Sequence, residues 1–260
     1  AGGGAGDGGR VEVTANGNID TYGGDSYGVF AQSVGGGGGI GGNIDRGLAK
    51  YWDVGIGVGI IKNSGNGGSG GEAVVTGKGI IHTRGDGSTG IFAQSVGGGG
   101  GVAGDQNGWG VAGSAGGNGS GDRITVDWTG RILTEGAGAH GIFAQSAGGE
   151  AIDVVVYDQD GNPTTTTLAR RQNLANDVRI TVHGDVIANG VGSDAIYAES
   201  KGDEGNGNIT VKVEDHGTVH GGTGTKAAGI RLVGGVANSV ENTGSIGTAD
   251  GILGLAIVGD

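Results

Sequence analysis

The strongest constraint on the fold is one short phrase that recurs along the chain. Residues 28–34 have the sequence Gly-Val-Phe-Ala-Gln-Ser-Val, residues 90–96 have Gly-Ile-Phe-Ala-Gln-Ser-Val, and five glycines follow each. A third copy lies at 141–147, and a diverged fourth copy, Ala-Ile-Tyr-Ala-Glu-Ser, lies at 195–200. A sequence that repeats on this scale builds a stack of similar units, each packed against its neighbours.

A glycine upstream of each phrase aligns the rest of the unit. Short β-branched pairs stand on both sides of this glycine, and a Gly-containing turn separates them from the phrase. Alternation with period two indicates strands rather than helices. We therefore expect three short strands per unit. The aligned glycines are Gly17, Gly79, Gly130 and Gly184, with Gly217 and Gly244 in looser fifth and sixth copies.

Three strands per unit with glycine at the corners predict an all-β fold, a parallel β-helix or β-solenoid. Successive rungs would lie about 4.8 Å apart. We expect a single domain over 1–260. Its rungs are predicted near 11–39, 73–101, 124–149, 178–200, 209–235 and 238–258, and its insertions at 40–72, 102–121 and 150–177.

The phrase has two alternating sets of side chains, and one of them should face the core. The Ile, Ala and Ser positions form one set, and the aromatic and Gln positions form the other. The fifth copy carries Arg231 at the aromatic position, where a charge would be costly if buried. We therefore place the Ile-Ala-Ser set inside. In the sixth copy, Ile252 is predicted to occupy the inward Ile position.

The outward set forms a stripe of aromatic residues beside a stripe of amides. Exposed aromatic ladders can bind ligands or associate with partners. Alternatively, Gly-rich flaps cover the stripe, and the amides stabilise the stack by hydrogen bonding along it. We favour the second interpretation. The candidate stripe consists of Phe30, Phe92, Phe143, Tyr197, Gln32, Gln94, Gln145 and Glu199.

Two insertions carry their own strand signals. Residues 54–60 alternate apolar residues with glycine and suggest an extra strand or a flap. In 150–177, two β-prone runs flank Asp-Gly-Asn-Pro at 160–163, which predicts a hairpin projecting from the rod. The candidate contact residues of this projecting loop are Asp158, Asp160, Asn162, Arg170 and Arg171.

Composition narrows the class of partner. The formal net charge of -12 argues against nucleic acid and against direct docking on anionic lipid. The chain has no Cys, which favours an exported protein over a cytosolic one. No signal peptide is visible at its start, and we interpret the chain as a piece of something longer.

The sequence contains no recognisable motif for catalysis or cofactor binding. The glycine runs precede no helix with Lys-Ser/Thr, so they are turns rather than phosphate loops. The calcium-binding nonapeptide pattern is not reproduced, which leaves only weak Ca²⁺ binding at clustered acids. Asp20 and His82 share an outward position, but Leu133 and Ile187 follow them, so no carboxylate ladder forms. We expect no catalytic, cofactor or metal residues and no enzymatic activity.

The phrase Gly-Ile-Phe-Ala-Gln-Ser-Val before five glycines, preceded by Gly-x-Ile-x-Thr-x-Gly, resembles the passenger repeats of large autotransporter proteins of Gram-negative bacteria. The copies at 17–39, 79–101 and 130–149 carry the likeness, and those from 184 onward depart from it. The resemblance implies a right-handed parallel β-helical passenger exported to the cell surface. It also implies a C-terminal β-barrel translocator, absent from this chain, as the link to the membrane.

These observations together lead to an expected function. We expect a structural and adhesive segment of an extracellular surface protein, a stiff rod that presents binding loops to a host surface or a glycan. One alternative is a filament subunit that associates end to end, or side by side through the stripe. A less favoured alternative is a glycan-cleaving β-helix, which would require clustered carboxylates.

Overall fold

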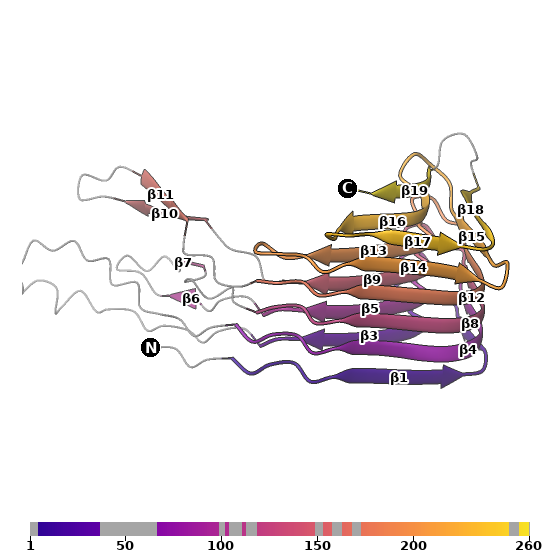
Figure 1. Cartoon of the computed structure of the whole chain (residues 1–260), viewed down its shortest axis with the longest axis horizontal. Coiled ribbons are helices and arrows are strands. Elements are labelled where there is room, and N and C mark those ends of the chain that lie inside the picture. Colours follow the sequence, from indigo (N-terminus) through magenta and orange to yellow (C-terminus); the bar gives the residue numbers. More distant parts are fainter. Residues whose placement is uncertain are drawn as a thin grey trace, which may run out of the picture.

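The computed structural model describes residues 5–36, 67–98, 119–148, 173–249 and 255–259, with the backbone of four short strands at 102–103, 111–112, 153–157 and 163–167. The chain in these ranges is built from strands and turns and contains no helix. It follows that none of these residues belongs to a helix able to cross a membrane. Figure 1 shows strands of successive repeats stacked side by side.

The larger sheet has nine strands and contains the segments around the aligned glycines. All of its pairings are parallel, in the order β1-β4-β8-β12-β14-β17, with β2, β15 and β18 beside this path. Its strands are β1 (Val11–Asn16), β2 (Ile19–Thr21), β4 (Ala73–Thr83), β8 (Ile124–Thr134), β12 (Val178–Ala188), β14 (Ile209–Glu214), β15 (Thr218–Gly221), β17 (Ser239–Asn242) and β18 (Ser245–Thr248).

The second sheet is formed by the repeated phrase itself. Its six strands are also parallel, in the order β19-β16-β13-β9-β5-β3. Each strand pairs with the copies before and after it in the sequence, so both sheets grow by one repeat at a time. The strands are β3 (Val29–Val34), β5 (Ile91–Val96), β9 (Ile142–Ala147), β13 (Ile196–Lys201), β16 (Ala228–Gly234) and β19 (Leu255–Gly259).

The predicted division into three strands per unit differs from the observed one. In β4, β8 and β12 the first two predicted strands form one continuous strand of 11 residues, with the aligned glycine inside it. In the first, fifth and sixth units they remain separate strands. The ladder pairing continues across the glycine in the middle units, from Gly79 to Gly130 and from Gly130 to Gly184.

The aligned glycines are required by both conformation and space. Gly17, Gly79, Gly130 and Gly184 have φ between 116° and 132°, a region that residues with a side chain rarely adopt. A Cβ on Gly79, Gly130 or Gly184 would also collide with the carbonyl oxygen of the glycine in the preceding unit. The glycine column therefore lets the strands bend at one place while staying at hydrogen-bonding distance.

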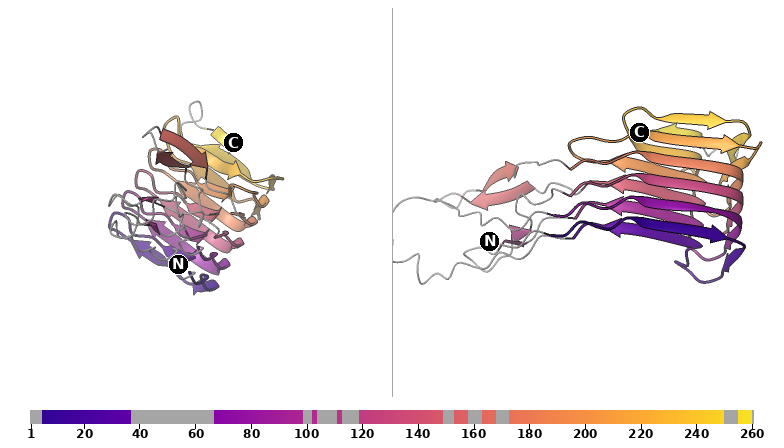
Figure 2. Two further views of the ribbon diagram at one scale, coloured as in Figure 1. Left: turned by 90° about the vertical axis from the view of Figure 1, so that its left-hand side faces the viewer. Right: turned by 60° about the horizontal axis from the view of Figure 1, so that its bottom comes forward.

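The core lies between the two sheets and confirms the predicted inward set. Ile91, Ala93 and Ser95 are fully buried, and so are Ile142, Ala144 and Ser146 in the next unit. Buried Val, Ile and Ala side chains from both sheets form one cluster that extends through the stack. Figure 2 shows the stack from two other directions. Small residues repeated in register thus give a thin, continuous core.

One large side chain fits this core because its neighbours are small. Trp128 is 1 % exposed and stands in register between Gly77 and Val182. A Cβ on Gly77 would come within 2.5 Å of the indole ring, so this glycine makes room for it. The indole Nε1 has no hydrogen-bond partner among the described residues.

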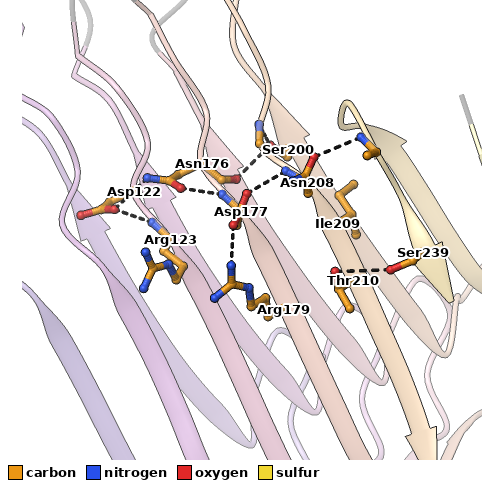
Figure 3. A network of polar contacts seen from close by, with 12 residues as sticks. Asp122, Arg123, Asn176, Asp177, Arg179, Ser200, Asn208, Ile209, Thr210 and Ser239 are labelled. Carbon is orange, nitrogen blue, oxygen red and sulfur yellow. Dashed lines mark hydrogen bonds and ion pairs between the residues drawn. The ribbon is translucent and has the colours of Figure 1, made fainter. Parts of the chain in front are cut away.

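Buried serines connect the two sheets at the edge where the insertions leave the stack. The Ser200 hydroxyl donates to the carbonyl of Asn176 at 2.9 Å and accepts the N–H of Gly207 at 2.8 Å. Ser33, Ser95 and Ser146 accept equivalent N–H groups, each at 2.8 Å. Figure 3 shows this edge, where the side chain of Asn176 also donates to Asp122. The serine of the phrase is therefore a cross-link between the sheets.

Charges alternate in sign along the position just before the first strand of each unit. Arg10, Glu72, Arg123 and Asp177 stack in this order, because each backbone N–H that follows bonds the carbonyl of the next member. Glu72 lies 2.8 Å from Arg10 and 3.7 Å from Arg123. Asp177 pairs with Arg179 at 2.7 Å (Figure 3). We call these four residues the charge column.

The sixth copy of the phrase is not where the sequence alignment put it. Ile257, rather than Ile252, pairs with Ile230, and Leu255 pairs with Ala228. Ile257 is 48 % exposed, unlike the buried Ile of the earlier copies, because no further described strand covers β19, and Ile252 lies outside the described residues. Two adjacent apolar stretches of similar composition made the choice between them ambiguous.

Within the predicted insertions, the described strands form two short antiparallel pairs. β10 (Asp153–Tyr157) pairs with β11 (Pro163–Thr167), which agrees with the predicted hairpin, and β6 (Val102–Ala103) pairs with β7 (Val111–Ala112). In Figure 1 the hairpin is drawn apart from the two parallel sheets. The predicted strand or flap at 54–60, and the loop residues Asp158, Asp160, Asn162, Arg170 and Arg171, lie outside the described residues.

Candidate functional site

The outward face of the six-stranded sheet carries a continuous stack of aromatic rings. Phe30, Phe92, Phe143 and Tyr197 pair in register, and neighbouring ring centroids are 4.9 Å apart. The rings are almost parallel, with interplanar angles of 3° to 7°. The predicted stripe is thus brought together by strand register alone, because every repeat places its ring over the previous one.

The stack is partly open to solvent. Phe30 at one end is 49 % exposed, and the other three rings have intermediate exposure. The segments predicted to cover it fall largely outside the described residues. In the described part, the ring edges face outward while the opposite face of the sheet packs into the core.

A second ladder runs beside the rings, two residues further along each strand. The amide of Gln32 donates to Gln94, and that of Gln94 donates to Gln145, so the amides form a chain across three strands. The fourth member, Glu199, accepts a hydrogen bond from the Tyr197 hydroxyl at 2.7 Å. Burial and this hydrogen bond raise the pKa of the Tyr197 hydroxyl well above its ordinary value.

Residues just before the phrase flank the other side of the rings. The Tyr27 ring lies 5.2 Å from Phe30 and 5.3 Å from Phe92, tilted against both. Two repeats later, the His140 ring lies 6.1 Å from Phe143 and 5.6 Å from Tyr197. Burial lowers the pKa of His140, although the nearby carboxylate of Asp194 opposes the shift. Tyr27 and His140 therefore pack against one side of the aromatic stack, and the glutamine amides lie along its other side.

A buried ion pair ends the aromatic stack. Arg231 stands in register with Tyr197 and replaces the fifth ring. Its guanidinium donates to both oxygens of Asp194, with Nε–Oδ2 at 2.7 Å and Nη2–Oδ1 at 3.0 Å. The Asp194 side chain is only 3 % exposed. The prediction that Arg231 points away from the core agrees with this position.

A polar cluster on the larger sheet joins residues from three units. His82 contacts Glu135 through Nε2 at 2.9 Å and Arg84 through Nδ1 at 3.0 Å, and Arg84 pairs with Asp20. The Arg84 guanidinium also lies 4.3 Å from the Tyr22 ring centroid, a cation–π distance. Hydrogen bonding to Arg84 lowers the pKa of Asp20. Each acidic group here already has a basic partner.

The described residues contain no group of three or more His, Cys, Asp or Glu side chains arranged to hold a metal ion. His183 lies near three carboxylates, 3.6 Å from Asp127, 3.4 Å from Glu214 and 3.3 Å from Asp215. These contacts are ion pairs when the imidazole is protonated.

The sequence identified the rings and amides but missed Tyr27, His140 and Asp194. They occupy one aligned position, immediately before the residue that opens each phrase, together with Thr89. The residue type at this position differs from repeat to repeat, so these residues form no recognisable sequence motif. The aligned position itself was the available signal, because stacking in register places one column beside the next.

Comparisons of this chain with protein-family models, with curated proteins and with solved structures found no match.

Proposed function

We propose that this chain is a structural and adhesive passenger segment of a bacterial cell-surface autotransporter, a stiff non-catalytic rod. The observation that carries the proposal is the parallel, in-register stacking of six successive repeats of the phrase. In such a stack each unit contacts only its neighbours, so length is gained without a larger core. The likeness of the phrase to autotransporter passenger repeats supplies the expected location and role.

Within this proposal the fold is a right-handed parallel β-helix with three sides per turn. In the four units that contain Gly17, Gly79, Gly130 and Gly184, this glycine, with φ between 116° and 132°, is proposed as the corner between the first two sides. The phrase strand then forms the third. Parallel strands joined by a crossover are right-handed in the large majority of proteins, which supports the handedness.

A role without catalysis is supported by the state of the acidic groups. A general acid in glycan cleavage needs a raised pKa. In the cluster on the larger sheet, the pKa of Asp20 is instead lowered by Arg84, and Glu135 is engaged by His82. Such pairing suits a structural network on the outside of a rod.

Surface exposure can be tested in the organism that encodes the protein. Intact cells are treated with trypsin, and the released peptides are identified by mass spectrometry. Release of peptides ending at Arg123, Arg131 or Arg179 from intact cells supports the proposal. If they appear only after the cells are lysed, the proposed location is wrong. A cytosolic protein followed in the same samples controls for leakage.

Electron microscopy of the purified chain over a range of concentrations separates the rod from the filament alternative. Separate short rods support a stalk or adhesin, whose loop at 150–177 would then be tested for adhesion by deletion. Filaments that lengthen with concentration favour the end-to-end subunit instead, since association by open strand edges depends on concentration.

A further inference from the structure

Along its side, the aromatic stack presents ring edges, because the faces between neighbouring rings are covered. At 4.9 Å spacing and nearly parallel planes, the inner faces of Phe30, Phe92, Phe143 and Tyr197 are covered by one another. Sugars bind aromatic residues mainly by lying on ring faces, and these faces are occupied. The edge of an aromatic ring is electropositive and prefers to point at the face of another ring.

The surface formed by these edges is long, narrow and straight. Tyr27 and His140 pack against one flank of the rings, and the hydrogen-bonded amides of Gln32, Gln94 and Gln145 lie along the other. Because the amides bond one another along the ladder, an inner amide such as that of Gln94 already uses one N–H and one oxygen lone pair within the protein. A flat aromatic molecule lying lengthwise across several strands would meet ring edges and amide planes together.

The charge of this surface is uneven along its length. Three of the four ladder positions carry neutral amides, and the fourth carries the carboxylate of Glu199, which is partly exposed. The chain as a whole has a net charge of -12. The Arg231 guanidinium, in register with Tyr197 on the next strand, is balanced by the carboxylate of Asp194. A ligand with a positive charge at one end is therefore favoured over a neutral or anionic one of the same shape.

We propose that the outer face of β3, β5, β9 and β13 is a binding site for elongated, planar aromatic cations. The ligand lies along the stack with its flat face against the edges of Phe92 and Phe143, and its positive end is next to Glu199. The site depends on register, since only stacked repeats bring the rings into one line. It is independent of whether the chain is an adhesin or a filament subunit.

The planar cationic dye thioflavin T is a direct probe, because its fluorescence rises when its rings are held flat. Titration of the purified protein should give a saturable rise. Phe92→Leu keeps an apolar side chain but breaks the ring stack, and Gln94→Lys puts a positive charge beside it. Each should weaken binding about ten-fold or more. Tyr22→Leu, which removes a ring that is 71 % exposed on the larger sheet, should leave binding unchanged.

A second experiment tests whether the ligand must carry a positive charge. An uncharged benzothiazole of the same shape should bind the parent protein more weakly than thioflavin T, and Glu199→Gln should narrow that difference. Circular dichroism melts confirm that every variant is folded. The proposal is overturned if Phe92→Leu and Gln94→Lys, once shown to be folded, bind the dye like the parent. It is also overturned if the signal is found only in sedimented aggregates.

Discussion

Asp194 and Arg231 come from adjacent repeats and form a bidentate ion pair at the end of the aromatic stack. Asp194 also accepts the N–H of Ala228 at 2.7 Å, and its side chain is almost fully buried. Removal of one partner of a buried pair leaves an uncompensated charge, which is far more costly than loss of a surface ion pair.

We therefore expect Arg231→Met to destabilise the protein by about 3 kcal/mol, measured by urea denaturation. The double variant Asp194→Asn with Arg231→Met should recover part of this loss, because it no longer buries an unpaired carboxylate. Equal stability of the single variant and the parent would contradict a structural role for the pair.

Stability should depend on the protonation of His140. Burial lowers the pKa of this imidazole, so the unfolded chain binds a proton more readily than the folded one. The Asp194 N–H donates to His140 Nδ1 at 3.0 Å, so protonation of that nitrogen would break a hydrogen bond. The contribution of His140 is present above the unfolded pKa of about 6.5 and is lost as the pH falls below it.

Melting temperatures measured between about pH 7.5 and 5.5 test this dependence. The parent should lose stability toward low pH more steeply than His140→Gln, which cannot titrate. The acidic and basic groups facing the ring, Asp194 and Arg231, are unchanged in both proteins. Parallel curves for the two proteins would show that His140 is not responsible.

Two aligned glycines should differ sharply in their tolerance of a methyl group. Gly17 and Gly79 have similar φ values, 127° and 132°, so alanine is strained at either. A Cβ at Gly17 meets nothing within 4 Å, whereas at Gly79 it collides with the Gly17 carbonyl. Gly79→Ala should therefore cost about 1–3 kcal/mol more than Gly17→Ala in chemical denaturation. Equal costs would mean that φ strain alone sets the requirement.

The assignment of inward and outward positions can be tested with one pair of substitutions. Ile91→Asp places a carboxylate at a fully buried position without a partner and should prevent folding at 25 °C, seen as loss of the β-sheet circular dichroism signal. Gln94→Lys introduces a charge three residues away on the outer face and should leave the signal intact. A folded Ile91→Asp variant would reverse the assignment.

Much of the fold could be predicted from the sequence because the repeats can be aligned with one another. Matching Gly17, Gly79, Gly130 and Gly184 gave the pairing of strands in both sheets, and Arg231 correctly separated the outer set from the inner one. The merging of two predicted strands into β4, β8 and β12 was not foreseen. Glycine usually interrupts a strand, but here ladder pairing continues through it.

The candidate site was predicted only in part, for a physical reason. Ring and amide columns consist of like residues, so repetition reveals them. The contacts of Tyr27 and His140 with the rings, and the network of His82 with Arg84 and Glu135, join unlike residues from different units. Such contacts depend on how far each side chain reaches across the stack, which a repeat alignment does not contain.

The charge column has a consequence for how nearly identical repeats find their proper order. The phrase is almost the same at β3, β5 and β9, so apolar packing alone hardly distinguishes a chain that has skipped a unit. A skip that set Arg10 against Arg123, or Glu72 against Asp177, would bring like charges together just before the first strand of each unit. Alternation of sign therefore makes the correct order of repeats more stable than an order in which one repeat is skipped.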